Sequence, residues 1–256
     1  MRLAPLVLAV VPACFPQNGG SPNPPQAPAQ LGADLPSHEI LSYNVEWRLI
    51  TAGRARLEFT RQPGGDARAS VHLESAGLVS TLYKVEDDYL VNLNSSLCAQ
   101  TVQMTSREGP RHRETRITFD AAARRADYLE RDRLKNTILL QHEIEIPPCV
   151  HDVLGALMFL RTLNLEPGQS TMAAVSDGKR SVMAKVEAQS REDIKTPEGT
   201  FHTICYEAYL FNNVLYRRPA HLHIWLTDDR RKLPVQVRVR MQFTIGTITL
   251  LLQKHE

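Results

Sequence analysis

The sequence lacks any long hydrophobic run, and this bounds where the chain can reside. Nowhere in its 256 residues do about 18 apolar residues follow one another, the length that a membrane-spanning helix needs. It also lacks an excess of one charge, because 30 basic residues face 28 acidic ones. A concentrated basic face is the usual sign of a nucleic-acid-binding protein. We therefore expect neither a transmembrane helix nor a nucleic-acid partner.

Motifs for catalysis and for cofactors are missing as well. The sequence contains no Gly-x-Ser-x-Gly, no phosphate-binding P-loop and no Gly-x-Gly-x-x-Gly. Its four cysteines are too few for a disulfide-built scaffold and lack the Cys-x-x-Cys spacing of a zinc site. No cofactor, no metal and no catalytic residue is predicted, and a non-enzymatic protein is favoured.

The N-terminus has the features of an export signal. A positive start precedes the apolar run Leu3–Val11, and a small residue follows before Cys14. Residues 1–13 are therefore predicted to be a signal peptide. The order of apolar run, small residue and cysteine resembles a bacterial lipobox, in which Cys14 becomes lipidated and attaches the protein to a membrane. Plain secretory cleavage is the competing interpretation. Either way the protein is expected in the periplasm or on the outer membrane.

Residues 14–36 are rich in proline, glycine, asparagine and glutamine. Such a segment cannot bury a core, so a disordered tether is predicted. Residues 37–256 are long enough for a single β-rich domain. Apolar and polar residues alternate strictly through the first strand, where Leu41, Tyr43, Val45 and Trp47 share one face. Turn signals divide the rest into about a dozen antiparallel strands, with a short helical turn at residues 77–83.

One convincing helix interrupts this pattern, at residues 147–168. Prolines precede it and Pro167-Gly168 ends it. Apolar residues recur at helical spacing at Val150, Val153, Leu154, Leu157 and Leu160. The opposite side is apolar too, so the helix needs cover on more than one side. The predicted fold is mainly β, a curved sheet or half-barrel with this central helix packed across or inside it. A sandwich of two sheets is the alternative.

Several motifs in order resemble a bacterial envelope family known as domain of unknown function 3108. The matching residues are Glu39, Tyr43, Trp47, Ala52-Gly53, Asp152-Val153-Leu154, Leu160-Arg161, Pro167-Gly168, Gly199-Thr200-Phe201, Ile224-Trp225-Leu226 and Leu233-Pro234-Val235. The resemblance covers residues 37–256 and implies no activity. The hairpin from Trp225 to Val235 is also similar to one in lipoprotein carriers of the LolA/LolB type. Those carriers are half-barrels, closed by helices, that hold acyl chains.

This second resemblance implies a lipid or another hydrophobic small molecule as ligand, held between sheet and helix. The candidate ligand-binding residues are Tyr43, Val45, Trp47, Leu154, Leu157, Leu160, Val237 and Val239. The alternative is a structural or assembly module of the envelope whose interior is filled by side chains. A cavity of about 300 Å³ or more favours the ligand.

A metal-dependent or hydrolytic enzyme is the second alternative. It would use His151, Asp152, His221 or His223. The simpler interpretation makes Asp152 a partner of the helix dipole and the two strand histidines solvent-facing.

The remaining cysteines have structural interpretations. Cys98 and Cys149 lie near element ends, where a disulfide can form in an oxidising compartment, with free thiols as the alternative. Cys205 lies within a strand and is expected to be a buried thiol.

Overall fold

The computed structural model describes residues 35–48, 50–241 and 246–256. The predicted signal peptide, Cys14 and most of the predicted tether therefore lie outside the described residues. Leu35 falls within the predicted tether, but its side chain is only 6% exposed and belongs to the main hydrophobic core.

Fourteen strands, rather than about a dozen, form one continuous sheet with antiparallel neighbours throughout. They are β1 (His38–Trp47), β2 (Ile50–Arg61), β3 (Ala67–Ser75), β4 (Val85–Leu93), β5 (Ala99–Glu108), β6 (Arg111–Asp120), β7 (Arg125–Asp132), β8 (Thr137–Glu145), β9 (Ser170–Ser176), β10 (Ser181–Thr196), β11 (Gly199–Ala208), β12 (Ala220–Thr227), β13 (Pro234–Met241) and β14 (Thr247–His255). Two helices accompany them in the described part of the chain, α1 (Gly77–Leu82) and α2 (Val153–Arg161). The short helical turn predicted at residues 77–83 corresponds to α1.

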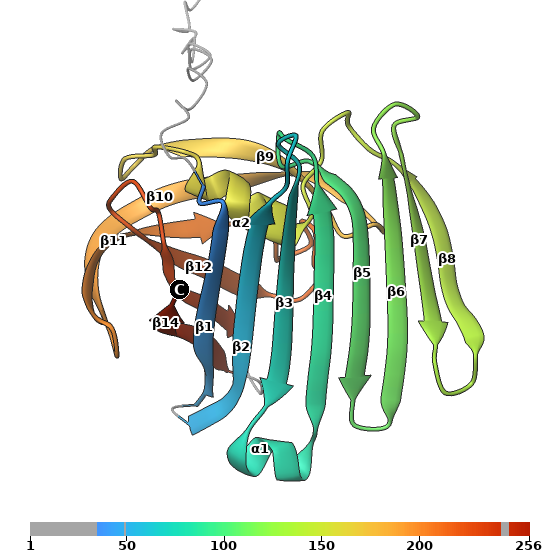
Figure 1. The fold of residues 1–256 in the computed structure, drawn as a ribbon, viewed down its shortest axis with the longest axis horizontal. Coiled ribbons are helices and arrows are strands. Elements are labelled where there is room, and N and C mark those ends of the chain that lie inside the picture. The colour runs from blue at the N-terminus through green and yellow to red at the C-terminus, as the bar shows by residue number, and fades with distance from the viewer. Residues whose placement is uncertain (1–34, 49, 242–245) are drawn as a thin grey trace, which may run out of the picture.

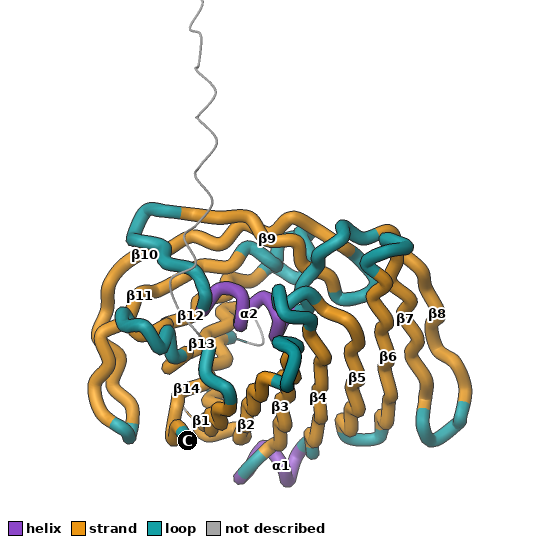
Figure 2. Tube along the Cα trace, turned by 45° about the horizontal axis from the view of Figure 1, so that its top comes forward, coloured by secondary structure: helices purple, strands orange, loops and turns teal. Residues whose placement is uncertain are grey.

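The order of the strands explains the shape of the molecule. β1 to β8 follow one another as a meander, and so do β9 to β14. The first strand pairs with the last, so the two meanders join at β1–β14 and leave β8 and β9 at the two ends. Figure 1 shows β1 to β8 as one broad wall, with β9 to β13 running across behind it. The tube in Figure 2 shows the sheet curling around α2. One continuous curled sheet excludes the sandwich.

The first strand follows the pattern expected from its sequence. Leu41, Tyr43 and Val45 are buried, and the residues between them are partly exposed. β14 and β2 flank β1, so their apolar side chains extend the same buried face: Val45 lies opposite Leu250 in the β1–β14 pairing. Period-two alternation therefore predicted both the strand and its buried side.

The helix is much shorter than the predicted span of residues 147–168. It covers nine residues, Val153–Arg161. Before it the backbone is extended: the His151 amide donates to the Ala174 carbonyl of β9 at 2.9 Å, and the Ser176 amide donates to the His151 carbonyl at 2.9 Å. After it the Thr162 hydroxyl donates to the Phe159 carbonyl at 2.7 Å and closes the last turn. The strand-like pairing of His151 sets where the helix begins, and the Thr162 cap sets where it ends. The spacing of apolar residues in the sequence contains neither signal.

The turn between β9 and β10 brings the two meanders together. Asp177-Gly178, a hairpin signal in the sequence, forms this turn, with Gly178 at a φ of +79°. A Cβ atom on Gly178 would lie 2.8 Å from the side chain of Ile117 on β6. The Lys179 ammonium lies 5.0 Å from the ring centroid of Tyr128 on β7. The C-terminal meander thus folds back onto the inner face of the N-terminal wall.

A disulfide fixes the segment that leads into α2. Cys98 and Cys149 are bonded, with their Cα atoms 5.2 Å apart, and link the β4–β5 connection to the residues before the helix. Next to it the Ala99 amide donates to the Val150 carbonyl at 2.8 Å. Cys205 is a free, buried thiol, and burial raises its pKa to about 12.

A buried ion pair holds the other end of α2. The side chains of Arg161 and Glu39 are 0% and 3% exposed. Arg161 Nη1 and Nη2 donate to the two carboxylate oxygens of Glu39 at 2.6 and 2.9 Å, while Nε donates to the Lys232 carbonyl at 3.0 Å. The Arg231 carbonyl accepts a further bond from Nη2 at 3.3 Å. The guanidinium thereby joins α2 to β1 and to the turn before β13.

Thiol counting tests the disulfide assignment. In a Cys14→Ser variant, unfolding without reductant should expose one thiol, that of Cys205, and reduction should raise the count to three. In the folded protein Cys205 should stay unlabelled at about pH 8, because burial keeps it in the unreactive thiol form. Three thiols in the unfolded, unreduced variant would contradict the assignment.

Removing one member of the buried ion pair should destabilise the protein strongly. Arg161→Met removes both hydrogen bonds that the buried Glu39 carboxylate accepts from the guanidinium and leaves only His255 Nε2 beside it, at 3.5 Å. We expect a loss of about 3–5 kcal/mol in the free energy of unfolding. The double variant Glu39→Leu/Arg161→Met should lose less than Arg161→Met alone, because no charge is then left buried. Urea unfolding measures both, with Arg54→Met in an exposed ion pair as control. An effect of Arg161→Met no larger than the control's would refute this role.

Candidate functional site: an apolar cavity beneath α2

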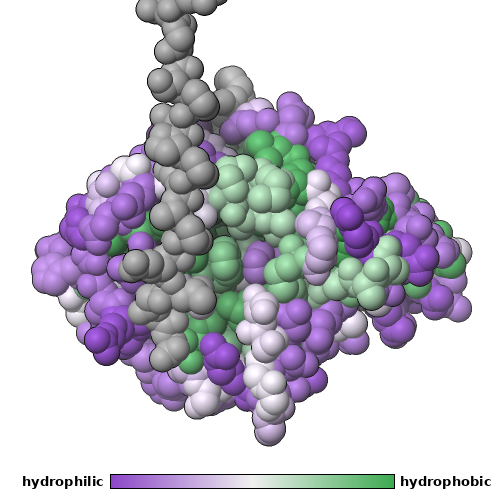
Figure 3. Space-filling view, turned by 90° about the horizontal axis from the view of Figure 1, so that it is seen from above, coloured by the Kyte–Doolittle hydropathy of each residue, from purple (hydrophilic) through white to green (hydrophobic). Residues whose placement is uncertain are grey.

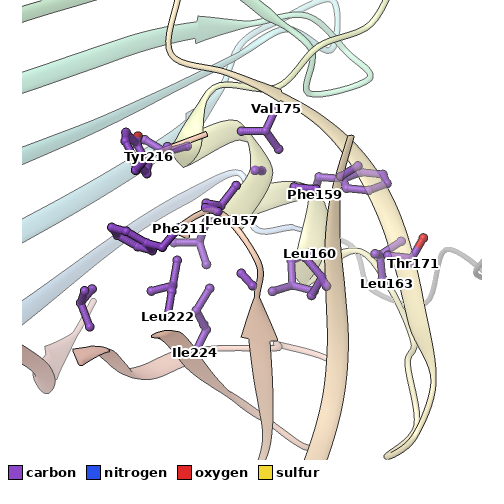
Figure 4. Close-up of a pocket in the computed structure, with 18 residues that line it drawn as sticks. Leu157, Phe159, Leu160, Leu163, Thr171, Val175, Phe211, Tyr216, Leu222 and Ile224 are labelled. Atoms are coloured by element: carbon purple, nitrogen blue, oxygen red, sulfur yellow. The ribbon is translucent and has the colours of Figure 1, made fainter. Parts of the chain in front are cut away.

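An apolar cavity of about 150 Å³ lies between α2 and the C-terminal meander. Its walls come from α2 and the residues after it, from β9 to β13 and from the β11–β12 loop. The lining residues are Val153, Ala156, Leu157, Phe159, Leu160, Leu163, Thr171, Ala173, Val175, Ala184, Val186, Ala208, Leu210, Phe211, Tyr216, Leu222, Ile224 and Val239. Figure 4 shows Leu157 and Leu160 on the helix side of this space, with Leu222 and Ile224 across from them.

Small side chains keep this space open. Ala173 on β9, Ala184 on β10 and Ala208 on β11 point toward the helix from neighbouring strands, and Ala156 faces them from α2. A methyl group at each position fills far less volume than the Leu, Val or Phe side chains of the rest of the core. The region is seen from above in Figure 3, where apolar residues gather near the middle of the face and polar residues surround them.

The cavity contains no ionised side chain. Its polar lining groups are the hydroxyls of Thr171 and Tyr216, and burial raises the Tyr216 pKa to about 12, so the phenol stays neutral. His151 borders the cavity wall, because its ring stacks on that of Phe159 with centroids 4.7 Å apart. Burial lowers the pKa of His151, which keeps the imidazole neutral as well. Such a site can hold an apolar group by burial of surface and offers no acid–base chemistry.

The structure brings three of the eight proposed ligand-binding residues into this lining, namely Leu157, Leu160 and Val239. The other five lie elsewhere. Tyr43 and Val45 are buried in the main core, where the Tyr43 hydroxyl donates to the Pro234 carbonyl at 2.7 Å. Leu154 packs on that core, Val237 packs on the cluster around Leu160, and Trp47 is partly buried, with the Arg48 guanidinium 5.2 Å from its ring centroid.

Asp152 is placed where it caps the helix. Its Oδ1 accepts from the Gly155 amide at 2.8 Å, and its Oδ2 accepts from the Leu154 amide at 3.1 Å and from the Tyr89 hydroxyl at 2.9 Å. Burial raises the pKa of Asp152, while these three hydrogen bonds oppose the rise. Burial also raises the pKa of Tyr89, so its phenol keeps the proton that it donates. The carboxylate is fully engaged in holding α2 against β4.

The three histidines considered for catalysis or metal binding each contact a different group. His151 Nδ1 lies 2.7 Å from the Leu97 carbonyl, and His221 Nδ1 lies 2.8 Å from a carboxylate oxygen of Glu207. The His223 ring packs on Trp225, with centroids 5.9 Å apart. Across the described residues, no three His, Cys, Asp or Glu side chains come close enough together to hold a metal ion. The hydrolytic and metal alternatives have no assembled site there.

The cavity volume falls below the range of pockets for drug-sized ligands, which begins at about 300 Å³. It equals that of an engineered apolar cavity of about 150 Å³ that binds benzene or xenon. The space therefore suits a narrow apolar group and not a complete lipid.

No helix in the described ranges is long and apolar enough to cross a membrane. The model of a family described as "protein of unknown function (DUF3108)" matches residues 42–253. No curated protein matches the sequence.

One solved structure shares the fold at very low sequence identity, and two others align with lower scores. A β-barrel-like protein of domain of unknown function DUF1849 from Brucella abortus has a TM-score of 0.55 at 7% identity, covering 89% of this chain and 98% of that one. A protein with a YmcC-like fold from Bacteroides fragilis has a TM-score of 0.38 at 8% identity, over 89% and 99% of the two chains. A DUF1089 family protein from Pseudomonas aeruginosa has a TM-score of 0.36 at 12% identity, over 74% and 90%.

A capping role for Asp152 predicts a graded response to substitution. Asp152→Ala removes the acceptor of two helix amides and leaves the Tyr89 hydroxyl unpaired, so we expect a loss of about 1–3 kcal/mol in the free energy of unfolding. Asp152→Ser keeps a capping oxygen and should lose less. Urea denaturation compares the two variants. Equal losses in both would show that capping is not what the residue contributes.

Proposed function

We propose that this chain, which belongs to the DUF3108 family, is an exported envelope protein that binds a narrow apolar ligand in the cavity beneath α2. The ligand class that fits is a single alkyl chain segment or a small apolar ring. The export signal in residues 1–13 supports the location, and Cys14 supplies a route to membrane attachment.

The observation that carries this proposal is an apolar space kept open by small residues. In protein cores, an unfilled cavity destabilises the fold by about 24 cal/mol per Å³. For the 150 Å³ beneath α2 this amounts to up to about 4 kcal/mol, because the space is only partly enclosed. A larger side chain at Ala173, Ala184 or Ala208 would recover part of that stability. With alanines at these positions, a ligand that enters the space can bury its own apolar surface against the lining.

The ligand must be apolar at the end that enters. The charged side chains at the two ends of α2 are already paired, Asp152 with the helix amides and Arg161 with Glu39. Burying a further charge in this lining would carry a large desolvation penalty without a partner. A polar headgroup, if the ligand has one, must therefore stay at the surface, while the alkyl part occupies the cavity.

A structural module of the envelope is the second candidate. It is favoured by the cavity volume of about 150 Å³, which is below the 300 Å³ that favours a ligand, and by the dense packing of the main core around Leu41, Phe59 and Val91, all fully buried. In that case the space beneath α2 is a packing defect, and the protein functions through its surface.

Cavity filling separates the two candidates. Titration calorimetry with decanoic acid should show binding with a negative heat-capacity change, the mark of apolar burial. Ala184→Phe places a ring in the cavity and should weaken binding by about tenfold or more, while raising or preserving stability. Met183→Phe is the matched control, because Met183 is the neighbouring residue on β10 but is 57% exposed on the other face.

Folding of the variants is checked by urea denaturation, and Ala184→Leu provides a smaller filling side chain if phenylalanine proves too large. Binding that Ala184→Phe and Ala184→Leu leave intact would place the ligand elsewhere. No binding by the wild-type protein, together with no lipid seen by native mass spectrometry of material from bacterial envelopes, would favour the structural module.

A further inference from the structure

The connections at the two ends of the N-terminal wall differ in the side chains that they expose. Antiparallel neighbours place alternate connections at the same end of a sheet. The α1 end of the wall therefore comprises the β1–β2 turn, the β3–β4 connection with α1, the β5–β6 turn and the β7–β8 turn. The opposite end comprises the β2–β3, β4–β5 and β6–β7 turns. Figure 1 shows α1 at the bottom of the view, beyond the ends of β3 and β4.

Large apolar side chains are exposed at the α1 end. Leu78 and Leu82 of α1 are 66% and 77% exposed. Ile50, Tyr83 and Leu134, from three of the four connections at this end, are 44%, 45% and 64% exposed. In the three connections at the opposite end, all within the described chain, no large apolar side chain is exposed. Exposed apolar side chains gathered in one region of a folded domain indicate an interaction surface.

Contacts with neighbouring elements hold α1 in place. The Ala76 amide donates to the Ala52 carbonyl of β2 at 2.8 Å, and the Tyr83 hydroxyl donates to the Glu108 carbonyl of β5 at 3.1 Å. The two leucines of α1 are four residues apart, so their side chains lie on the same face of the helix. No residue of α1 is buried. The helix thus holds two leucines toward solvent and contributes nothing to the core.

The connections at the α1 end carry basic residues without acidic ones. Segments 48–50, 76–84, 109–110 and 133–136 contain Arg48, Lys84, Arg133 and Lys135 and no aspartate or glutamate. Strand residues pair with two of these cations, Lys84 with Glu86 at 3.4 Å and Arg133 with Glu114 at 2.9 Å. Both basic side chains stay 73% and 63% exposed, so they remain accessible to a further anion. The three connections at the opposite end carry one charge of each sign.

We propose that the α1 end docks on the surface of a phospholipid bilayer that contains anionic lipid. Leu78 and Leu82 enter the boundary between headgroups and acyl chains, with Tyr83 beside them, while Lys84 and Lys135 contact lipid phosphates. Apolar and aromatic side chains with basic neighbours are typical of proteins that lie on this surface. The exposed side chains project from separate connections, which a fluid surface accommodates without a matching shape. The charge of the connections has the sign that anionic lipid attracts.

This contact is separate from the cavity and from the N-terminus. No residue that lines the cavity comes from the α1 end. β1 begins at His38 and reaches the α1 end at Trp47, so Cys14 precedes the opposite end of that strand. Membrane docking and ligand binding can therefore fail separately, and a Cys14→Ser variant excludes the lipid anchor from the measurement.

Vesicle flotation of the full chain with Cys14→Ser tests the apolar contact. It should bind vesicles of phosphatidylethanolamine with phosphatidylglycerol more tightly than vesicles of phosphatidylcholine. Adding Leu78→Ser/Leu82→Ser should weaken binding by about tenfold or more, because the inserted side chains are lost. Met172→Ser/Met183→Ser is the matched control, since it removes two exposed apolar side chains of β9 and β10. Circular dichroism checks that the variants keep the fold.

Fluorescence quenching locates the contact, because residues 1–13 are common to every variant. Emission from Leu82→Trp should be quenched by lipids with brominated acyl chains, and emission from Met183→Trp should not exceed the quenching of the parent protein. Absence of flotation, an effect of Leu78→Ser/Leu82→Ser no larger than the methionine control's, or no added quenching at residue 82 would each overturn the proposal.

Removing charge tests the lipid class. Lys84→Gln/Lys135→Gln should weaken binding to the anionic vesicles by about tenfold or more and leave binding to phosphatidylcholine unchanged. Lys185→Gln/Lys254→Gln is the matched control, because it removes the same charge at two exposed lysines of β10 and β14. Equal effects of the two double variants would contradict the assignment to anionic lipid.

Discussion

The buried Arg161–Glu39 ion pair is the contact on which the architecture depends. Glu39 lies on β1, the strand that joins the two meanders, and Arg161 lies at the last turn of the helix. The guanidinium also donates to the Lys232 and Arg231 carbonyls and to Met158 Sδ, so all five of its N–H groups have a partner, which is what makes burial of the pair tolerable. At the opposite end of the helix, Asp152 and Tyr89 form a second fixed point on β4. The helix is therefore fixed at both ends to different parts of one sheet.

Because α2 is fixed at both ends, it cannot shift inward to fill the cavity beneath it. Leu157 and Leu160 stand between the two fixed points and face Leu222 and Ile224 across the cavity. In most cores a void is reduced by the inward shift of a neighbouring element, since its lining atoms gain dispersion contacts. Here such a shift would break either the ion pair or the helix cap. The fixed helix and the alanines of β9, β10 and β11 together account for an apolar cavity that persists.

Local patterns predicted much of this fold, and long-range contacts account for what they missed. Alternation around Tyr43 located β1 and its buried face, and Asp177-Gly178 located the β9–β10 turn. The helix was predicted too long, because its start is set by pairing of His151 with β9, a partner distant in the chain. Glu39 and Arg161 are 122 residues apart, so no spacing rule connects them. Of the candidate ligand-binding residues, Tyr43 and Val45 lie in the main core and Leu157 and Leu160 line the cavity. The alanines that line it have no distinctive sequence pattern, so the sequence alone does not single them out.

The central claim is that the space beneath α2 is empty of protein atoms and accepts an apolar guest. A crystal of the protein pressurised with xenon tests it directly, because xenon enters dry apolar cavities of this size. The account predicts xenon density between Leu157 and Leu222, with α2 unmoved and the Arg161–Glu39 pair intact. Side chains filling that space in the crystal, with no xenon bound there, would contradict it.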